Sequence, residues 1–185
     1  MLIAFLLAVA AAVLGIARGG SLEALSATKL RWAWLLAAGL GLATVAGLWA
    51  PPWLTGARAL LFLILSNLAL LVFIAGNRRM PGMLIADVGL ALNLLVIVLN
   101  GAMPVSTAAA RSAGIERSPG SSGLKHEAMS SDTFLPWLGD VVPVPGLREV
   151  WSIGDLVLAV GIARLVYAGT TSERQAAATP SRASG

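Results

Sequence analysis

Five apolar runs, each long enough to cross a lipid bilayer, constrain the fold of this chain more than any other feature. They cover residues 2–17, 32–50, 59–75, 83–99 and 151–168. Each run is about 16 to 19 residues long, which as an α-helix spans about 24 to 29 Å and matches a hydrocarbon core about 30 Å thick. Such runs are too long for barrel strands, and a spanning helix satisfies its own backbone hydrogen bonds. We therefore predict an all-α membrane protein, a bundle of about five transmembrane helices.

The composition supports lipid as the solvent for much of the chain. Hydrophobic residues make up 57% of the sequence and charged residues only 12%, whereas a soluble domain carries about 25% charged residues. A soluble enzyme and a disordered regulator are therefore disfavoured. The net charge of +4 does not indicate nucleic acid, because the basic residues stand at the ends of apolar runs, where they set orientation. There is no cysteine, which excludes disulfides and thiolate chemistry. We predict the bilayer as partner, with no nucleic acid and no cofactor.

Lysine and arginine in the short loops predict the orientation. The first run has no basic residue before it, so it is interpreted as a retained helix and not as a signal peptide. The second loop carries only Arg58, whereas seven basic residues lie in the first loop, the third loop and the tail: Arg18, Lys29, Arg31, Arg78, Arg79, Arg174 and Arg182. The positive-inside rule then places the N-terminus outside and the C-terminus in the cytoplasm. Residues 1–168 form one bundle, and residues 169–185 are predicted to be a disordered cytoplasmic tail.

The long segment 100–150, between the fourth and fifth runs, is predicted to lie outside. Residues 106–114 indicate a short helix, with Ser106 as N-cap and Gly114 as its stop. Residues 118–123 are typical of a flexible linker. Residues 134–147 are apolar, but three prolines break them, which favours an interfacial or re-entrant segment over a span: Pro136, Pro143 and Pro145.

Four of the polar residues inside the predicted spans lie away from the outer face. Asp87 and Arg164 lie at similar depth on helices that run in opposite directions, so they could form an ion pair. Alternatively, Arg164 extends to the lipid headgroups and Asp87 meets interfacial water. Asn67 and Asn93 fall near the middle of the membrane, where an amide can bridge two helices. All four are interpreted as structural.

A second set of polar residues is expected to gather at the outer face. Asn100 ends the fourth span, His126 and Asp140 lie in the outer segment, and Asp155 lies about one turn into the fifth span. Asp155 stands among apolar residues, so an ionised carboxylate there needs a partner. The partner could be Asp140, through a shared proton, or protonated His126, or Arg148. A single histidine among scattered carboxylates is a weak metal signal, and we predict no metal site.

The strings NGAMPVS, KH, LPWLGDVVPVP and WSIGD, in this order after four apolar runs, resemble a family of small bacterial multi-pass proteins described only as a domain of unknown function. The resemblance covers roughly residues 1–168. One departure is that Ala102 stands where the family has a second glycine and an aromatic residue before Met103. The resemblance implies a bacterial inner-membrane protein and implies no activity.

A local resemblance to lipoprotein signal peptidase concerns the two outer aspartates. That family has an aspartyl dyad at the membrane boundary, and here G-D-V-V and W-S-I-G-D place Asp140 and Asp155 in similar positions. Asn100-Gly101-Ala102 is faintly similar to its N-x-G-A motif. The N-L-x-D-R motif of that family is missing, Ser152 replaces an asparagine, and there are five spans instead of four.

Three functional hypotheses follow, in order of preference. The first is a membrane protein without enzymatic activity, whose outer segment packs on the bundle and forms a polar site for a protein partner, a lipid or a small ligand. The second is a membrane-embedded hydrolase in which Asp140 and Asp155 activate water. The third is a small transporter or channel subunit that uses Asp155 and Asn93. The lack of a charged residue at the membrane midplane argues against this hypothesis.

Overall fold

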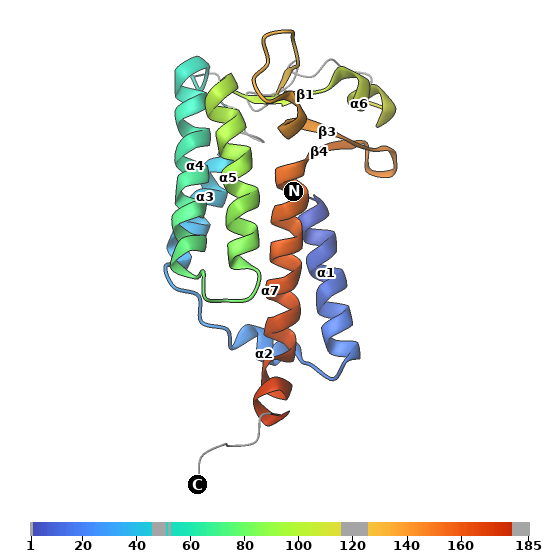
Figure 1. The fold of residues 1–185 in the computed structure, drawn as a ribbon. Coiled ribbons are helices and arrows are strands. Elements are labelled where there is room, and N and C mark those ends of the chain that lie inside the picture. Colours follow the sequence, from blue (N-terminus) through green and yellow to red (C-terminus); the bar gives the residue numbers. More distant parts are fainter. Residues whose placement is uncertain (1, 46–50, 52, 116–125, 179–185) are drawn as a thin grey trace.

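The computed structural model describes residues 2–45, 51, 53–115 and 126–178, and it is mostly helical (Figure 1). Within these residues three helices are long and apolar enough to cross a membrane: α4 (Gly56–Gly76), α5 (Met83–Asn100) and the part Ile153–Ser172 of α7 (Ile153–Ala178). Two further apolar helices are shorter, α1 (Leu2–Ala17) with 16 residues and α3 (Ala33–Thr44) with 12. Three of the five predicted spans are therefore full-length helices, and part of the run 32–50 lies outside the described residues.

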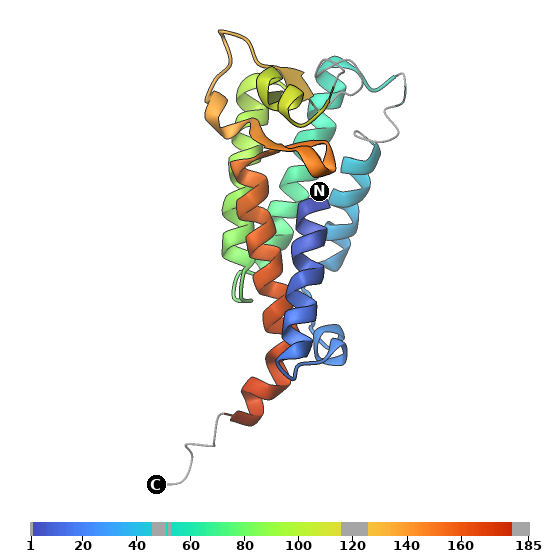
Figure 2. The same ribbon diagram turned by 90° about the vertical axis from the view of Figure 1, so that its right-hand side faces the viewer.

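The helices pack in series. α3 packs on α4, α4 on α5, α5 on α7, and α7 on α1, while the short α2 (Leu22–Ser26) lies beside α7 (Figures 1 and 2). The apolar core has two parts along this series. One part joins α4 and α5 near the helix ends that meet the segment 101–152, and it includes Leu63, Val96, Met103 and Leu138. The other part lies nearer the opposite ends of the same helices.

Glycines bring α5 and α7 together at backbone distance. A Cβ placed on Gly89 would lie 2.6 Å from the carbonyl oxygen of Gly154, and one on Gly161 would lie 2.8 Å from the Cα atom of Ala86. Any larger side chain would therefore push the two helices apart. Small residues at such contacts let helices approach closely where the hydrophobic effect gives no driving force between them.

A small cap covers one end of the helices and contains the candidate site. It is a four-stranded sheet in the order β2-β1-β3-β4, and it is followed directly by α7 (Figure 1). The strands are β1 (Met103–Val105), β2 (His126–Ala128), β3 (Asp140–Val144) and β4 (Glu149–Ser152). β1 pairs in parallel with both β2 and β3, whereas β3 and β4 are antiparallel. Helix α6 (Thr107–Ser112) and the 3-10 turns η2 (Pro136–Leu138) and η3 (Pro145–Leu147) complete the cap.

The cap corrects one prediction and confirms another. The chain is mostly helical, but the prediction that it is all-α fails in the cap, because residues 103–152 contain a sheet. The segment 134–147, predicted to be interfacial or re-entrant, supplies η2, β3 and η3, and its position relative to a membrane stays a prediction. The predicted short helix is confirmed as α6, whose N-cap Ser106 accepts a hydrogen bond from the amide of Ala109 at 3.2 Å. The predicted linker 118–123 lies outside the described residues.

The end of the last helix also differs from the prediction. α7 continues to Ala178, ten residues beyond the predicted boundary at 168, so the first part of the predicted tail is helical. Thr170 and Thr171 are buried, and the carbonyl of Thr170 accepts a hydrogen bond from the amide of Ser21 at 2.8 Å. These contacts with the α1–α2 connection extend the helix through a polar sequence that carries no apolar signal. The rest of the predicted tail, 179–185, is outside the described residues.

Candidate functional site

The side chain of Asn100, at the end of α5, holds the cap through hydrogen bonds to both backbone polar groups of Phe134. We call this pair of bonds the Asn100 clamp. The Oδ1 atom of Asn100 accepts a hydrogen bond from the amide of Phe134 at 2.8 Å, and its Nδ2 atom donates to the carbonyl of Phe134 at 3.0 Å. The same Nδ2 atom donates to the carbonyl of Val96, one turn earlier in α5, at 2.9 Å. The side-chain amide of Asn100 therefore fixes the backbone of Phe134 against the end of α5.

The backbone beside this clamp is strained. Leu135 has φ 50° and ψ 53°, which is the left-handed region, although it has a side chain and precedes Pro136. Such a conformation costs of order 1 kcal/mol or more and persists where its surroundings impose it. Here the clamp fixes the preceding residue, and Leu138, two residues after Pro136, is buried in the core. Phe134 is thereby held in a position where it is 62% exposed.

A pocket of about 270 Å³ opens beside the clamp. Its walls come from the last turn of α5, the start of β1, β2, and the loop 130–134. The lining residues are Leu99, Asn100, Ala102, Pro104, Glu127, Ala128, Ser130, Asp132, Thr133 and Phe134. Glu127 and Asp132 are both exposed, and among the described residues that line the pocket there is no lysine, arginine or histidine. The C-terminal end of α5 adds partial negative charge to the same place, so the pocket favours a cationic or hydrogen-donating group.

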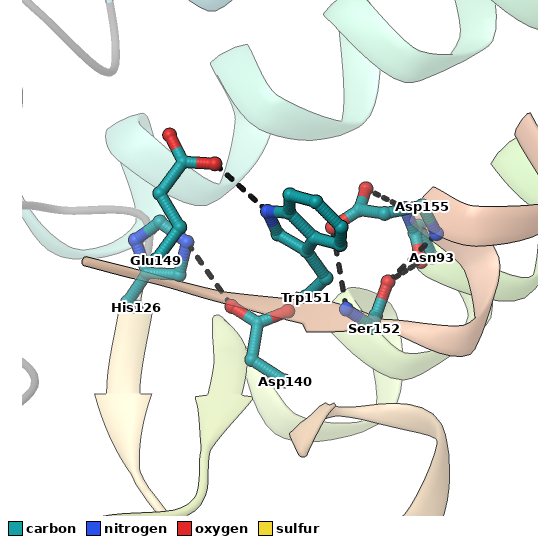
Figure 3. A network of polar contacts seen from close by, with 7 residues as sticks. All are labelled: Asn93, His126, Asp140, Glu149, Trp151, Ser152 and Asp155. Atoms are coloured by element: carbon teal, nitrogen blue, oxygen red, sulfur yellow. Dashed lines mark hydrogen bonds and ion pairs between the residues drawn. The ribbon is translucent and has the colours of Figure 1, made fainter. Parts of the chain in front are cut away.

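Asp155 is committed to a hydrogen-bond network that joins α5 to the start of α7 (Figure 3). Its Oδ1 atom accepts from Nδ2 of Asn93 at 2.9 Å, and its Oδ2 atom faces the amide of Ser152 at 3.4 Å. The Ser152 hydroxyl accepts from the amide of Asp155 at 2.9 Å and donates to Oδ1 of Asn93 at 2.9 Å. Ser152 and Asp155 thus form a reciprocal cap at the first turn of α7, equivalent to a capping box, and Asn93 ties this cap to α5.

Asp140 belongs to a different set of contacts. Its Oδ2 atom lies 3.5 Å from Nε2 of His126, and the Asp140 side chain is 6% exposed while that of His126 is 49% exposed. Across the sheet, Asp140 pairs with Ser152, so β3 and β4 bring it close to the α7 cap in the backbone. Figure 3 shows the Asp140 carboxylate directed to His126 and the Asp155 carboxylate directed to Asn93 and Ser152. The topology therefore groups His126 with Asp140, and Asp155 with Asn93, whereas Asn100 lies at the pocket.

The polar residues nearer the other end of the spans take separate positions. Arg164 is exposed, and in the described part of the chain no ion pair joins it to Asp87. Asp87 has one buried carboxylate oxygen, Oδ1, with no hydrogen-bond partner among the described residues. Asn67 donates from Nδ2 to the carbonyl of Leu63 in its own helix at 2.8 Å. The predicted Asp87–Arg164 pair is therefore not formed, and the alternative, in which Arg164 reaches the headgroups and Asp87 meets interfacial water, stays a prediction.

Sequence reasoning missed two kinds of residue. The first is Asn77 at the end of α4, which is 4% exposed and clamps the backbone of Arg31 as Asn100 clamps that of Phe134. The second is the acidic pair Glu127 and Asp132, which no sequence motif singled out. Their available signal is that both acidic residues stand shortly before the apolar segment that begins at Phe134, in a part of the chain predicted to lie outside.

These features define a class of protein: a bundle of apolar membrane-type helices whose end is closed by a small, hydrogen-bonded mixed cap containing a pocket. The model of the Family of unknown function (DUF5317) matches residues 27–167, which includes α3 to α6, the whole cap and α7 as far as residue 167, and the chain belongs to this family. No curated protein and no solved structure matches the chain.

Proposed function

We propose that this protein is a five-span membrane protein that binds a small cationic ligand at its outer face, in the pocket between α5 and the cap. The pocket itself is the observation that carries the proposal, since it is lined by two exposed carboxylates and by Asn100, whose side chain fixes the backbone of Phe134 in the same wall. In this arrangement α1 and α3 join the three longer helices as spans, the N-terminus and the cap lie outside, and the C-terminus lies in the cytoplasm.

The lining supports a ligand with two kinds of group. Glu127 and Asp132 offer charge-assisted hydrogen bonds to an ammonium or guanidinium group, and each such bond contributes about 1.5 to 3 kcal/mol. Leu99 and the exposed ring of Phe134 offer an apolar wall, and an aromatic face also attracts cations. At about 270 Å³ the pocket is near the lower end of the range for small-molecule sites. A short alkylamine or alkylguanidine fits both its size and its chemistry.

The contacts of the two aspartates favour binding over hydrolysis. An aspartyl dyad needs two carboxylates that share a proton and hold a water between them. Here Asp155 is engaged by Asn93 and Ser152, and Asp140 by His126. The same network favours binding over transport, because Asn93 and Asp155 join two helices through hydrogen bonds and do not line the pocket.

Ligand binding can be tested with butylamine and butylguanidine on the purified protein in neutral detergent. We expect millimolar concentrations of either probe to raise the thermal unfolding temperature. In the double variant Glu127→Gln/Asp132→Asn, affinity should fall at least tenfold, because two charge-assisted hydrogen bonds are weakened. Glu23→Gln is the matched control, since Glu23 is an exposed carboxylate on α2, outside the pocket. Equal binding by the double variant and the wild type would refute the proposed site.

The proposed orientation can be tested by labelling, because the chain contains no cysteine. Ser131→Cys, in the loop of the cap, should react with a membrane-impermeant maleimide in intact spheroplasts. Ser26→Cys, at the end of α2, should react only after the membrane is permeabilised. Both serines are exposed, so a difference in labelling reports the side of the membrane. The reverse pattern would invert the topology and place the pocket in the cytoplasm.

A further inference from the structure

The end of the bundle opposite the cap contains a second polar construction, which the pocket does not involve. Asn77 is buried at 4% exposure and terminates α4. Its Oδ1 atom accepts from the amide of Arg31 at 2.9 Å, and its Nδ2 atom donates to the carbonyl of Arg31 at 2.9 Å and to that of Phe73 at 2.8 Å. The side chain of Asn77 therefore connects the segment before α3 to the loop after α4, although 46 residues separate Arg31 from Asn77. We call these hydrogen bonds between Asn77 and Arg31 the staple.

This staple brings basic residues from two loops together. Lys29 and Arg31 lie on one side of it, Arg78 and Arg79 on the other, and all four side chains are exposed. The sequence from 27 to 34 and from 77 to 82 contains no aspartate or glutamate. Arg164 of α7 joins the same end, because a Cβ on Gly82 would lie 3.1 Å from its Cβ atom. The nearest acidic residues in the sequence are Glu23 on α2 and Asp87, one turn into α5.

Two tryptophans, Trp32 and Trp34, indicate how deep these basic residues lie relative to a membrane surface. Trp32 lies against the end of α4, where a Cβ on Gly76 would lie 2.6 Å from its ring, and the guanidinium of Arg31 lies 5.2 Å from the Trp32 ring centroid. Trp34 is 67% exposed on the first turn of α3. Tryptophan at the end of an apolar helix is typical of the headgroup level of a membrane. The cluster Lys29, Arg31, Arg78, Arg79 and Arg164 therefore stands where lipid phosphates are.

We propose that this cationic cluster, held together by Asn77, is a binding site for the headgroup of an anionic phospholipid. Basic residues at the ends of membrane helices attract anionic lipid in general, and each contributes a factor of about five near the surface. The staple adds what scattered charges lack, because it fixes the backbone of Arg31 against the residue before Arg78, so that cations from two loops are held at the same end of the bundle. A membrane lipid is favoured over a free phosphate because α4, α5 and α7 present apolar surface directly beside the cluster.

The test compares phosphatidylglycerol with phosphatidylcholine, added to the full chain in neutral detergent and followed by native mass spectrometry and thermal unfolding. We expect phosphatidylglycerol to bind at least tenfold more tightly than phosphatidylcholine. The variant Arg31→Gln/Arg78→Gln/Arg79→Gln should lose at least tenfold of that affinity. The control Arg58→Gln/Arg111→Gln, which removes exposed arginines near the cap, should change it less than twofold. An equal loss in the control, or no loss in the triple variant, would overturn the proposal.

Two further experiments distinguish a defined lipid site from nonspecific electrostatic attraction and from a site for free phosphate. Asn77→Ala keeps every charge but removes the staple, so it should weaken phosphatidylglycerol binding severalfold; wild-type affinity in this folded variant would overturn the role of the staple. If Asn77→Ala does not fold, the triple variant still decides the proposal, because it leaves the staple intact. Inorganic phosphate should not compete at equal concentration, and full competition would assign the site to a free phosphate instead.

Discussion

Replacing Gly89 with alanine is expected to destabilise the bundle strongly, by about 3 kcal/mol or more. A Cβ at this position would lie 2.6 Å from the carbonyl oxygen of Gly154 and 2.9 Å from the Cα atom of Leu158. Both are backbone atoms of α7, so no side-chain rotation relieves the clash, and the helices must separate. Overpacking in a well-packed core costs about 1 to 3 kcal/mol. Here the separation would also stretch the Asn93–Asp155 hydrogen bond.

Gly41→Ala is the matched control for this substitution. Gly41 lies on α3, and a Cβ there would meet no heavy atom within 4 Å. Alanine is favoured over glycine inside a helix by about 1 kcal/mol, so this variant should be as stable as the wild type or slightly more stable. Thermal unfolding in one detergent, followed by tryptophan fluorescence, measures both. Equal stability of Gly89→Ala and Gly41→Ala would contradict the close backbone contact between α5 and α7.

The long helices could be predicted from the sequence because their signal is local. An unbroken apolar run reports its own length, and α5 begins at the predicted residue and ends one residue later than predicted, at Asn100. The strands of the cap carry no such signal. β1 and β2 have three residues each and β3 contains a proline, so none shows a clear alternation of apolar and polar residues. Their pairing depends on contacts between β1, β2 and β3 that are distant in sequence.

The candidate site shows the same limit. Asn100 could be singled out as a polar residue at the end of a span, but its partner Phe134 lies 34 residues away and bonds through its backbone, which any residue has. The repetition of this clamp in Asn77 and Arg31 is informative. In both cases the residue after the clamped one adopts a positive φ, 50° at Leu135 and 54° at Trp32, and the next residue begins a helical turn. The clamp is therefore a structural device that positions its surroundings, and at the cap these include the pocket.

Asp155→Ala is expected to destabilise the protein by about 3 kcal/mol. The substitution removes the reciprocal cap with Ser152, which is worth about 0.5 to 2 kcal/mol. It also leaves Nδ2 of Asn93 without this acceptor at a position that is 7% exposed, and an unsatisfied buried donor costs about 1 to 3 kcal/mol. Asp132→Ala removes an exposed carboxylate and should stay within about 0.5 kcal/mol of the wild type.

A double-mutant cycle with Asn93→Ala distinguishes this structural role from a chemical one. Asn93 and Asp155 share one hydrogen bond, so the combined variant should cost less than the sum of the two single variants by about 1 kcal/mol or more. Thermal unfolding of the four proteins gives the coupling energy. A catalytic carboxylate predicts a different pattern, in which Asp155→Ala folds with wild-type stability and its effects on stability and those of Asn93→Ala are additive. That pattern would return Asp155 to the group of candidate catalytic residues, whereas coupled destabilisation assigns it to the junction between α5 and α7.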